Sequence, residues 1–203
     1  MVNASDQARD GEAAGSRPMR SDARRSLDAL LQAAKEVFAT SGVDAPVREI
    51  AGRAGVGVGT VYRHFPERAG LIAAVFRREI DDCAGAAAAL AAECAPFDAL
   101  ARWLQRLADF FLTKRGLAGA LHSGDDAFAA LPSHFDRRLR PALQALLVTA
   151  TQAGQARADV AADELLLAVA RLCAAPSEAP DPAKRMVALL TDGLRQRPGQ
   201  LGA

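Results

Sequence analysis

The stretch of the chain best suited to binding chemistry is AGVGVGTVYRHF, residues 54–65. Gly55, Gly57 and Gly59 stand at alternate positions, and glycine-rich loops can cradle phosphate groups with their backbone amides. A nucleotide loop, however, needs a preceding β-strand and GxGxxG or GK[ST] spacing, whereas these glycines read GxGxG and follow the helical-looking VREIAGRA. The alternative is a tight turn between two helices, in which Gly55 supplies the positive φ angle that ends the first helix. The sequence favours the turn.

The residues after these glycines carry hydrogen-bond donors. A helix over residues 58–65 would display Thr60, Tyr62, Arg63 and His64. Their hydroxyl, phenol, guanidinium and imidazole groups suit phosphate oxygens and base edges in the major groove of DNA. The glycines at the start of this helix would let its backbone come close to a phosphate. The segment therefore predicts a helix-turn-helix that binds DNA.

The longer stretch REIAGRAGVGVGTVYRHFPERAGLI, residues 48–72, resembles the signature of the tetracycline-repressor (TetR) family of bacterial transcriptional regulators. The similarity covers about residues 24–78 and is most specific in AGV…GTVYRHF. The resemblance implies a three-helix DNA-binding head, a linking fourth helix, and a helical body that binds a ligand and forms dimers. It also implies a repressor that dimerises on a palindromic operator and is released by a small hydrophobic ligand.

The resemblance assigns roles to individual residues of the head. Thr60, Tyr62 and His64 would contact phosphates, and Val58, Gly59 and Arg63 would face base edges. Arginines at the starts of the second and fourth helices would contact further phosphates. The implied DNA-binding residues are Arg48, Val58, Gly59, Thr60, Tyr62, Arg63, His64 and Arg68.

Each of these roles has a plainer alternative. The amphipathic ring of Tyr62 could pack in the core, and His64 could be a solvated residue at the end of the helix. Arg48 and Arg68 could be ordinary surface charges. Because Val58 and Gly59 offer no polar side chain, we expect Arg63 to carry most of the base specificity.

The elements that must position these residues are helical. Alanine and leucine are abundant, β-branched and aromatic residues are sparse, and no window alternates apolar and polar residues. The apolar periodicity predicts an all-α fold with about nine helices. The expected spans are 21–41, 46–54, 58–65, 67–93, 97–115, 117–122, 132–153, 163–175 and 182–196.

Three regions follow from this pattern. Residues 1–20 are expected to form a disordered arm, residues 21–81 a DNA-binding domain with its helix-turn-helix at about 46–65, and residues 82–203 a ligand-binding and dimerisation domain. Residues 20–80 carry ten Lys or Arg against seven Asp or Glu, in a chain whose net charge is +1. A mildly basic segment ahead of a neutral body fits a head that binds nucleic acid.

The body is expected to hold an effector. Its helices have many bulky apolar residues packed around small alanines, which can leave a cavity for a small hydrophobic or aromatic molecule, although aromatic stripes at helical spacing are usually core. Arg102, Arg106 and His134 could add polar contacts. The candidate pocket residues are Trp103, Leu107, Phe110, Phe111, Leu121, His122, Phe128, Phe135 and Leu139.

The last two expected helices, 163–175 and 182–196, are rich in leucine and alanine. The resemblance implies that they form a four-helix bundle across a homodimer, and palindromic half-sites also require two heads. The alternative is that these helices only close the core of the monomer.

The sequence gives little support to an enzymatic function. His122 and Ser123 precede Asp125 and Asp126, but no nucleophile elbow surrounds them, and the paired acids are expected to cap a helix. His122 and His134 lack further metal ligands, so neither a metal nor a cofactor is expected. The alternative functions are a DNA-binding architectural protein that does not respond to ligands and, with less support, a helical enzyme.

Cys83, Cys94 and Cys173 lie far apart without a CxxC motif, which favours small apolar residues in a reducing compartment over redox sensors. The first 20 residues lack the apolar core of a secretory signal, and the apolar run at 84–92 is too short to span a membrane. We therefore expect a cytoplasmic protein without a membrane partner.

Overall fold

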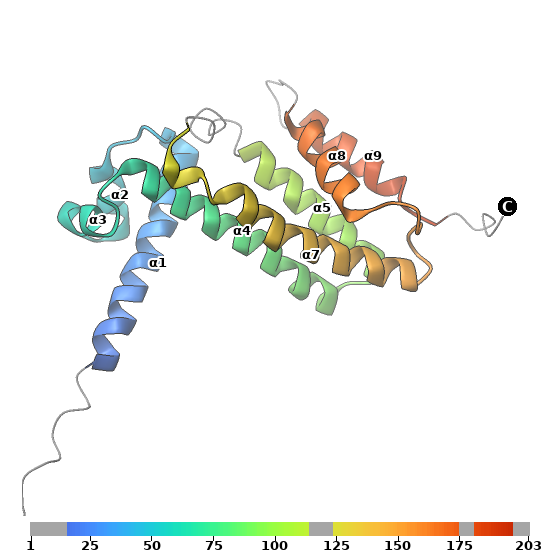
Figure 1. Cartoon of the computed structure of the whole chain (residues 1–203), viewed down its shortest axis with the longest axis horizontal. Coiled ribbons are helices and arrows are strands. Elements are labelled where there is room, and N and C mark those ends of the chain that lie inside the picture. The colour runs from blue at the N-terminus through green and yellow to red at the C-terminus, as the bar shows by residue number, and fades with distance from the viewer. Residues whose placement is uncertain (1–15, 114–123, 175–180, 197–203) are drawn as a thin grey trace, which may run out of the picture. The chain divides into compact units, whose positions relative to one another are not determined.

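The computed structural model describes residues 16–113, 124–174 and 181–196. This part of the chain forms eight α-helices and one 3-10 helix and has no β-strand, which confirms the all-α fold (Figure 1). The expected helix at 117–122 lies outside the described residues. In chain order the helices are α1 (Ser16–Ser41), α2 (Val47–Ala54), α3 (Val58–His64), α4 (Arg68–Glu93), α5 (Pro96–Thr113), η2 (Asp126–Phe128), α7 (Leu131–Gln152), α8 (Ala162–Ala174) and α9 (Asp181–Asp192).

The chain divides into two compact units, and the boundary between them along the sequence falls between Pro66 and Glu67. The first unit contains α1 to α3 and the second contains α4 to α9. This division falls earlier than the boundary expected after residue 81, because α4 packs against α5 and α7 of the second unit.

Helix α1 begins at Ser16, five residues before the predicted start, so residues 16–20 of the expected arm are helical. Pro18 lies in the first turn, where a helix needs no N–H donor from it. The helix ends at Ser41 as predicted, and Gly42 follows with a φ angle of 77°. A left-handed residue of this kind commonly ends a helix.

The core of the first unit lies between α1 and α2. Leu30, Ala34 and Val37 of α1 are fully buried, as is Ile50 of α2, and Ala51 is almost fully buried. The four-residue spacing of Leu30 and Ala34 and the three-residue step to Val37 produce a continuous apolar stripe on one side of α1.

Helix α5 is the centre of the second unit, because it contacts α4, α7, α8 and α9. Leu100, Trp103, Leu104 and Leu107 of this helix are completely buried. The indole N–H of Trp103 donates a hydrogen bond of 2.9 Å to the backbone oxygen of Cys83 in α4.

The chain after α9 pairs with the turn after α7, so α9 ends four residues earlier than predicted. The N–H of Arg157 donates to the oxygen of Leu194, and the N–H of Gln196 donates to the oxygen of Gln155, both at 2.9 Å. The side-chain oxygen of Gln155 also accepts a hydrogen bond from the N–H of Phe97 at the start of α5. The turn therefore joins two other segments of the unit.

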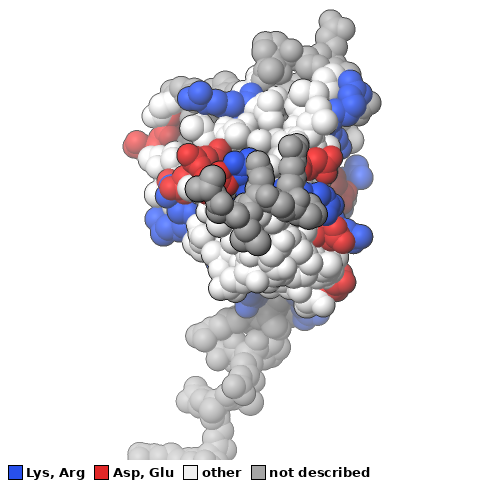
Figure 2. Space-filling view, turned by 90° about the vertical axis from the view of Figure 1, so that its right-hand side faces the viewer, with Lys and Arg blue, Asp and Glu red and all other residues white. Residues whose placement is uncertain are grey.

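Basic and acidic side chains are mixed around a broad uncharged area on the face of the second unit seen in Figure 2, which is the right-hand side of Figure 1. Among the described residues visible on this face, neither sign of charge gathers into one extended patch (Figure 2). Within the described ranges, no helix combines the length and the apolar character needed to cross a membrane.

Candidate nucleic-acid interface and effector site

The turn between α2 and α3 is built by Gly55. Its φ and ψ angles are 68° and 27°, a left-handed conformation that costs other L-residues free energy. The N–H of Val56 then donates to the oxygen of Ala51 at 3.0 Å, as in a Schellman helix end. The segment before the glycines is α2, so the predicted helix turn is confirmed and a strand-borne phosphate loop is excluded.

Unlike Gly55, Gly57 and Gly59 are not required by the local fold. Gly57 has a φ angle of −71°, which any residue can adopt. A Cβ atom at either position would meet no other atom within 4 Å. Neither backbone conformation nor packing within the described chain therefore requires glycine at these two positions.

Helix α3 has one buried and one exposed side. Val61 is buried, whereas Val58, Arg63 and His64 are exposed. The side chain of Tyr62 is 52% exposed, so the alternative that it belongs to the core is wrong. Four of the residues assigned to base edges or phosphates, Val58, Tyr62, Arg63 and His64, are therefore exposed to solvent.

The remaining DNA-binding candidates are Thr60 in α3 and two arginines near the starts of other helices. Thr60 is half-buried, and Arg48 is exposed in the first turn of α2. Arg68 is the first residue of α4 and belongs to the second unit. Among the described residues, neither Arg48 nor Arg63 has an ion-pair partner, so both guanidiniums are available for a ligand.

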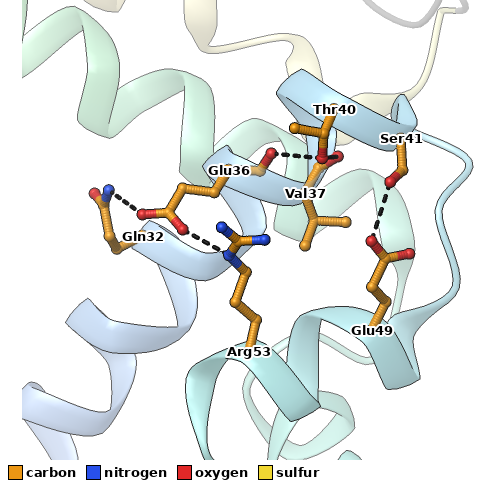
Figure 3. Close-up of polar contacts among 7 residues, drawn as sticks. All are labelled: Gln32, Glu36, Val37, Thr40, Ser41, Glu49 and Arg53. Carbon is orange, nitrogen blue, oxygen red and sulfur yellow. Dashed lines mark hydrogen bonds and ion pairs between the residues drawn. The ribbon is translucent and has the colours of Figure 1, made fainter.

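A polar network fixes α2 on α1 (Figure 3). The Glu36 carboxylate accepts hydrogen bonds from Gln32 at 3.0 Å and from Nε of Arg53 at 2.6 Å. These two contacts, that with Gln32 first, lower the pKa of Glu36. The hydroxyl of Ser41 also donates to Glu49. The sequence did not predict this network. The four-residue spacing of Gln32 and Glu36 is typical of a contact within one helix, but no local pattern indicates the contacts between the two helices.

Three of the candidate pocket residues form an aromatic cluster between α5 and α7. The ring centroids of Phe110 and Phe111 lie 5.5 Å apart, and those of Phe135 lie 6.3 and 5.7 Å from them. All three side chains are half-buried. Such spacings are favourable for packed aromatic pairs.

Other candidate pocket residues are more deeply placed. Trp103, Leu107 and Leu139 are completely buried, and Phe128 in η2 is nearly so. These side chains pack in the interior of the second unit. The last two candidates, Leu121 and His122, lie outside the described residues.

A charged cluster links α4 to α7 beside the aromatic rings. Oδ1 of Asp81 in α4 lies 3.1 Å from Nε2 of His134 and accepts a hydrogen bond of 2.6 Å from Nε of Arg138. His134 directly precedes Phe135 of the aromatic cluster. Sequence reasoning missed Asp81 and Arg138, because 57 residues separate them and no local pattern joins them.

The residues considered for catalysis, redox chemistry or metal binding include several whose contacts are structural. Asp125 accepts a hydrogen bond from the N–H of Ala127 at 2.9 Å, which confirms that this acid caps a helix. Burial raises the pKa of the Cys83 thiol to about 11, so this thiol stays protonated at neutral pH. In the described segments, no group of three or more His, Cys, Asp or Glu could hold a metal ion.

Two family models match the chain. The model for bacterial regulatory proteins of the tetR family matches residues 30–75. The model for the C-terminal domain of SbtR-like transcriptional regulators matches residues 95–196. No curated protein sequence matches the chain.

Solved structures agree with these matches. A TetR transcriptional regulator from Streptomyces coelicolor is 37% identical, with 83% of this chain and 98% of that chain covered and a TM-score of 0.71. A TetR regulator from Mycobacterium vanbaalenii is 34% identical, with 88% and 99% covered and a TM-score of 0.70. RolR, solved in complex with resorcinol, is 21% identical, with 86% and 90% covered and a TM-score of 0.54, and supports the fold alone.

Proposed function

Because the chain belongs to the TetR family of bacterial transcriptional regulators, we propose that it is a cytoplasmic repressor that binds a palindromic operator as a homodimer and is released by a small hydrophobic or aromatic effector. The observation that carries the DNA-binding part is the outward face of α3, where Tyr62 and Arg63 are exposed. An exposed tyrosine and an arginine without an ion pair offer hydrogen-bond donors to the phosphates and base edges of DNA.

In the proposed complex, Arg63 donates to base edges from the last turn of α3. Thr60, Tyr62 and His64 donate to phosphates, and Arg48 and Arg68 add phosphate contacts. Gly57 and Gly59 support this arrangement. The fold itself does not require glycine at these positions. Glycine would, however, allow the backbone at the start of the helix to come close to DNA, because it has no side chain.

Replacing Arg63 tests the proposal. Arg63→Ala is expected to weaken operator binding by about 1–3 kcal/mol and to relax specificity at one base pair. The operator would be selected from random duplexes with the wild-type protein, and affinities would be measured by gel shift. Arg137→Ala, which removes an exposed arginine from α7, is the matched control. Equal affinity of both variants for the operator would refute the role of Arg63.

The aromatic cluster of Phe110, Phe111 and Phe135 supports an effector site in the body. Its rings are half-buried, so they can contact a ligand without complete unpacking of the core. The fold is shared with RolR, which binds resorcinol, a small aromatic compound. We assign the chain a small aromatic effector of similar size.

The Asp81 cluster provides a route from the effector to α4. An effector that moves Phe135 also moves His134, whose ring nitrogen contacts Asp81 of α4. Helix α4 begins directly after the first unit ends at Pro66. An effector can release DNA in this way only if it binds more tightly to the conformation with low DNA affinity.

Thermal unfolding tests the effector site. A panel of small aromatic compounds that includes resorcinol is expected to contain a ligand that, at 100 times its dissociation constant, stabilises the protein by about 2.7 kcal/mol and raises Tm by roughly 5–10 °C. Phe110→Ala should lose this shift, whereas Val148→Ala, on an exposed part of α7, should keep it. A panel without any stabilising compound would contradict the proposed effector class.

The dimer is assigned to the outer faces of α8 and α9. Leu167 is 53% exposed and Leu189 is 61% exposed, whereas Val169 and Val187 on the inner faces are fully buried. Large apolar side chains that are exposed opposite the buried faces of two neighbouring helices fit a surface that a partner covers. A second copy of the chain would cover them.

A further inference from the structure

A groove outside the aromatic cluster runs between α5 and α9 in the second unit. Its volume is about 410 Å³, within the range of about 300–1,000 Å³ that is typical of small-molecule sites. Its lining combines the small residues Ala101 and Ala188 with polar and charged residues: Arg102, Gln105, Arg106, Asp109, Thr191 and Asp192.

The groove exists because α5 and α9 are held together at both ends. At one end, Nζ of Lys184 lies 2.5 Å from Oδ1 of Asp109, and the side-chain amide of Gln105 donates to the oxygen of Lys184. At the other end, the guanidinium of Arg195 lies 4.0 Å from the centre of the Phe97 ring. Between these contacts the facing residues include Ala101 and Ala188, which are too small to fill the space.

The groove is lined by two arginines and two aspartates, but the arginines are not paired with these acids. Arg102 and Arg106 are exposed and lie one turn apart on α5, and like charges at this spacing destabilise a helix. Asp109 is already paired with Lys184. Within the described ranges, no carboxylate, that of Asp192 included, lies within 4.0 Å of either guanidinium. An external anion would balance the two arginines.

We propose that this groove binds a small amphipathic carboxylate, with its carboxylate on Arg102 and Arg106 and its apolar part over Ala101 and Ala188. Guanidinium groups form directional, charge-assisted hydrogen bonds with carboxylates. Asp192 repels the carboxylate and so favours its placement on the arginine side. The bound molecule would touch both α5 and α9 and would strengthen their packing. This site is separate from the effector site proposed at Phe111 and Phe135, and it does not depend on that proposal.

Calorimetric titration of the full chain with decanoate tests the site. The wild-type protein should bind decanoate saturably, and R102Q/R106Q should bind it at least tenfold more weakly. Arg137→Gln, a matched loss of one exposed arginine on α7, should leave binding unchanged. Decanol and inorganic phosphate should each bind at least tenfold more weakly than decanoate, because one lacks the charge and the other the apolar chain.

A second variant separates shape from charge. Ala188→Leu fills the groove without altering any charge and should also abolish decanoate binding, whereas Phe110→Ala should retain it. The proposal is overturned if the wild-type protein does not bind decanoate, if R102Q/R106Q binds it normally, or if only Phe110→Ala loses it. If phosphate bound as tightly as decanoate, the groove would be a simple anion contact that does not recognise an apolar chain, and the proposal would also be overturned. Circular dichroism would establish that each variant is folded.

Discussion

Trp103→Ala is expected to lower the free energy of unfolding of the second unit by about 3–5 kcal/mol, the range for removal of a buried tryptophan from a packed core. Trp103 is completely buried in the central helix α5, which four other helices contact. The substitution removes the largest buried side chain and leaves a cavity among helices that cannot collapse freely. It also removes the hydrogen bond from the indole N–H to the oxygen of Cys83, which contributes about 1 kcal/mol.

Urea unfolding followed by far-ultraviolet circular dichroism measures this effect, because the variant lacks the only tryptophan in the chain. Trp103→Phe keeps an aromatic ring and should cost less than Trp103→Ala. Val148→Ala removes an exposed side chain of α7, away from the proposed dimer interface, and should change the free energy of unfolding by less than about 0.5 kcal/mol. A Trp103→Ala protein as stable as the wild type would show that Trp103 lines an open cavity and not the core.

The double variant L167E/L189E should weaken the homodimer by about 2–4 kcal/mol, which is roughly 30- to 1,000-fold in the dissociation constant. Both leucines are exposed on the monomer, so the folded monomer should tolerate the change. In the proposed dimer, the carboxylates would lie in an apolar interface and would lose their hydration. The protein should then bind a palindromic operator much more weakly, because two linked heads no longer act together.

Sedimentation at micromolar concentration measures the association, and V148E is the matched control. Val148 is another exposed apolar residue, but it lies on α7 and not on α8 or α9. This control should remain dimeric. A wild-type protein that is strictly monomeric would refute the dimer proposal. A dimeric L167E/L189E variant would show that the interface does not include these two leucines.

Local features of the head could be predicted from the sequence because short-range chemistry decides them. Gly55 supplies a backbone conformation that few other residues adopt, so its position after a helical pattern marks the turn. Ile50 before the turn and Val61 after it are both buried, as expected for apolar residues that join the two helices of the motif. The outward position of Tyr62 followed from the resemblance and not from its own chemistry, since a tyrosine fits both core and surface.

Features that depend on distant segments could not be predicted. The end of α9 is decided by hydrogen bonds to Gln155 and Arg157, and the charge cluster joins Asp81 to Arg138 of another helix. Residues so far apart meet only once the helices are packed. The groove between α5 and α9 is a similar case, because Ala101 and Ala188 create space only where the two helices face each other.

The turn at Gln155 has a consequence for how the second unit opens. Its backbone holds the chain after α9, and its side chain holds the N–H of Phe97 at the start of α5. The guanidinium of Arg195 lies against the Phe97 ring at the same place. The C-terminal helix therefore cannot fray from its end as an isolated last helix would. We expect α9, the turn after α7 and the start of α5 to exchange their amide hydrogens as one cooperative group.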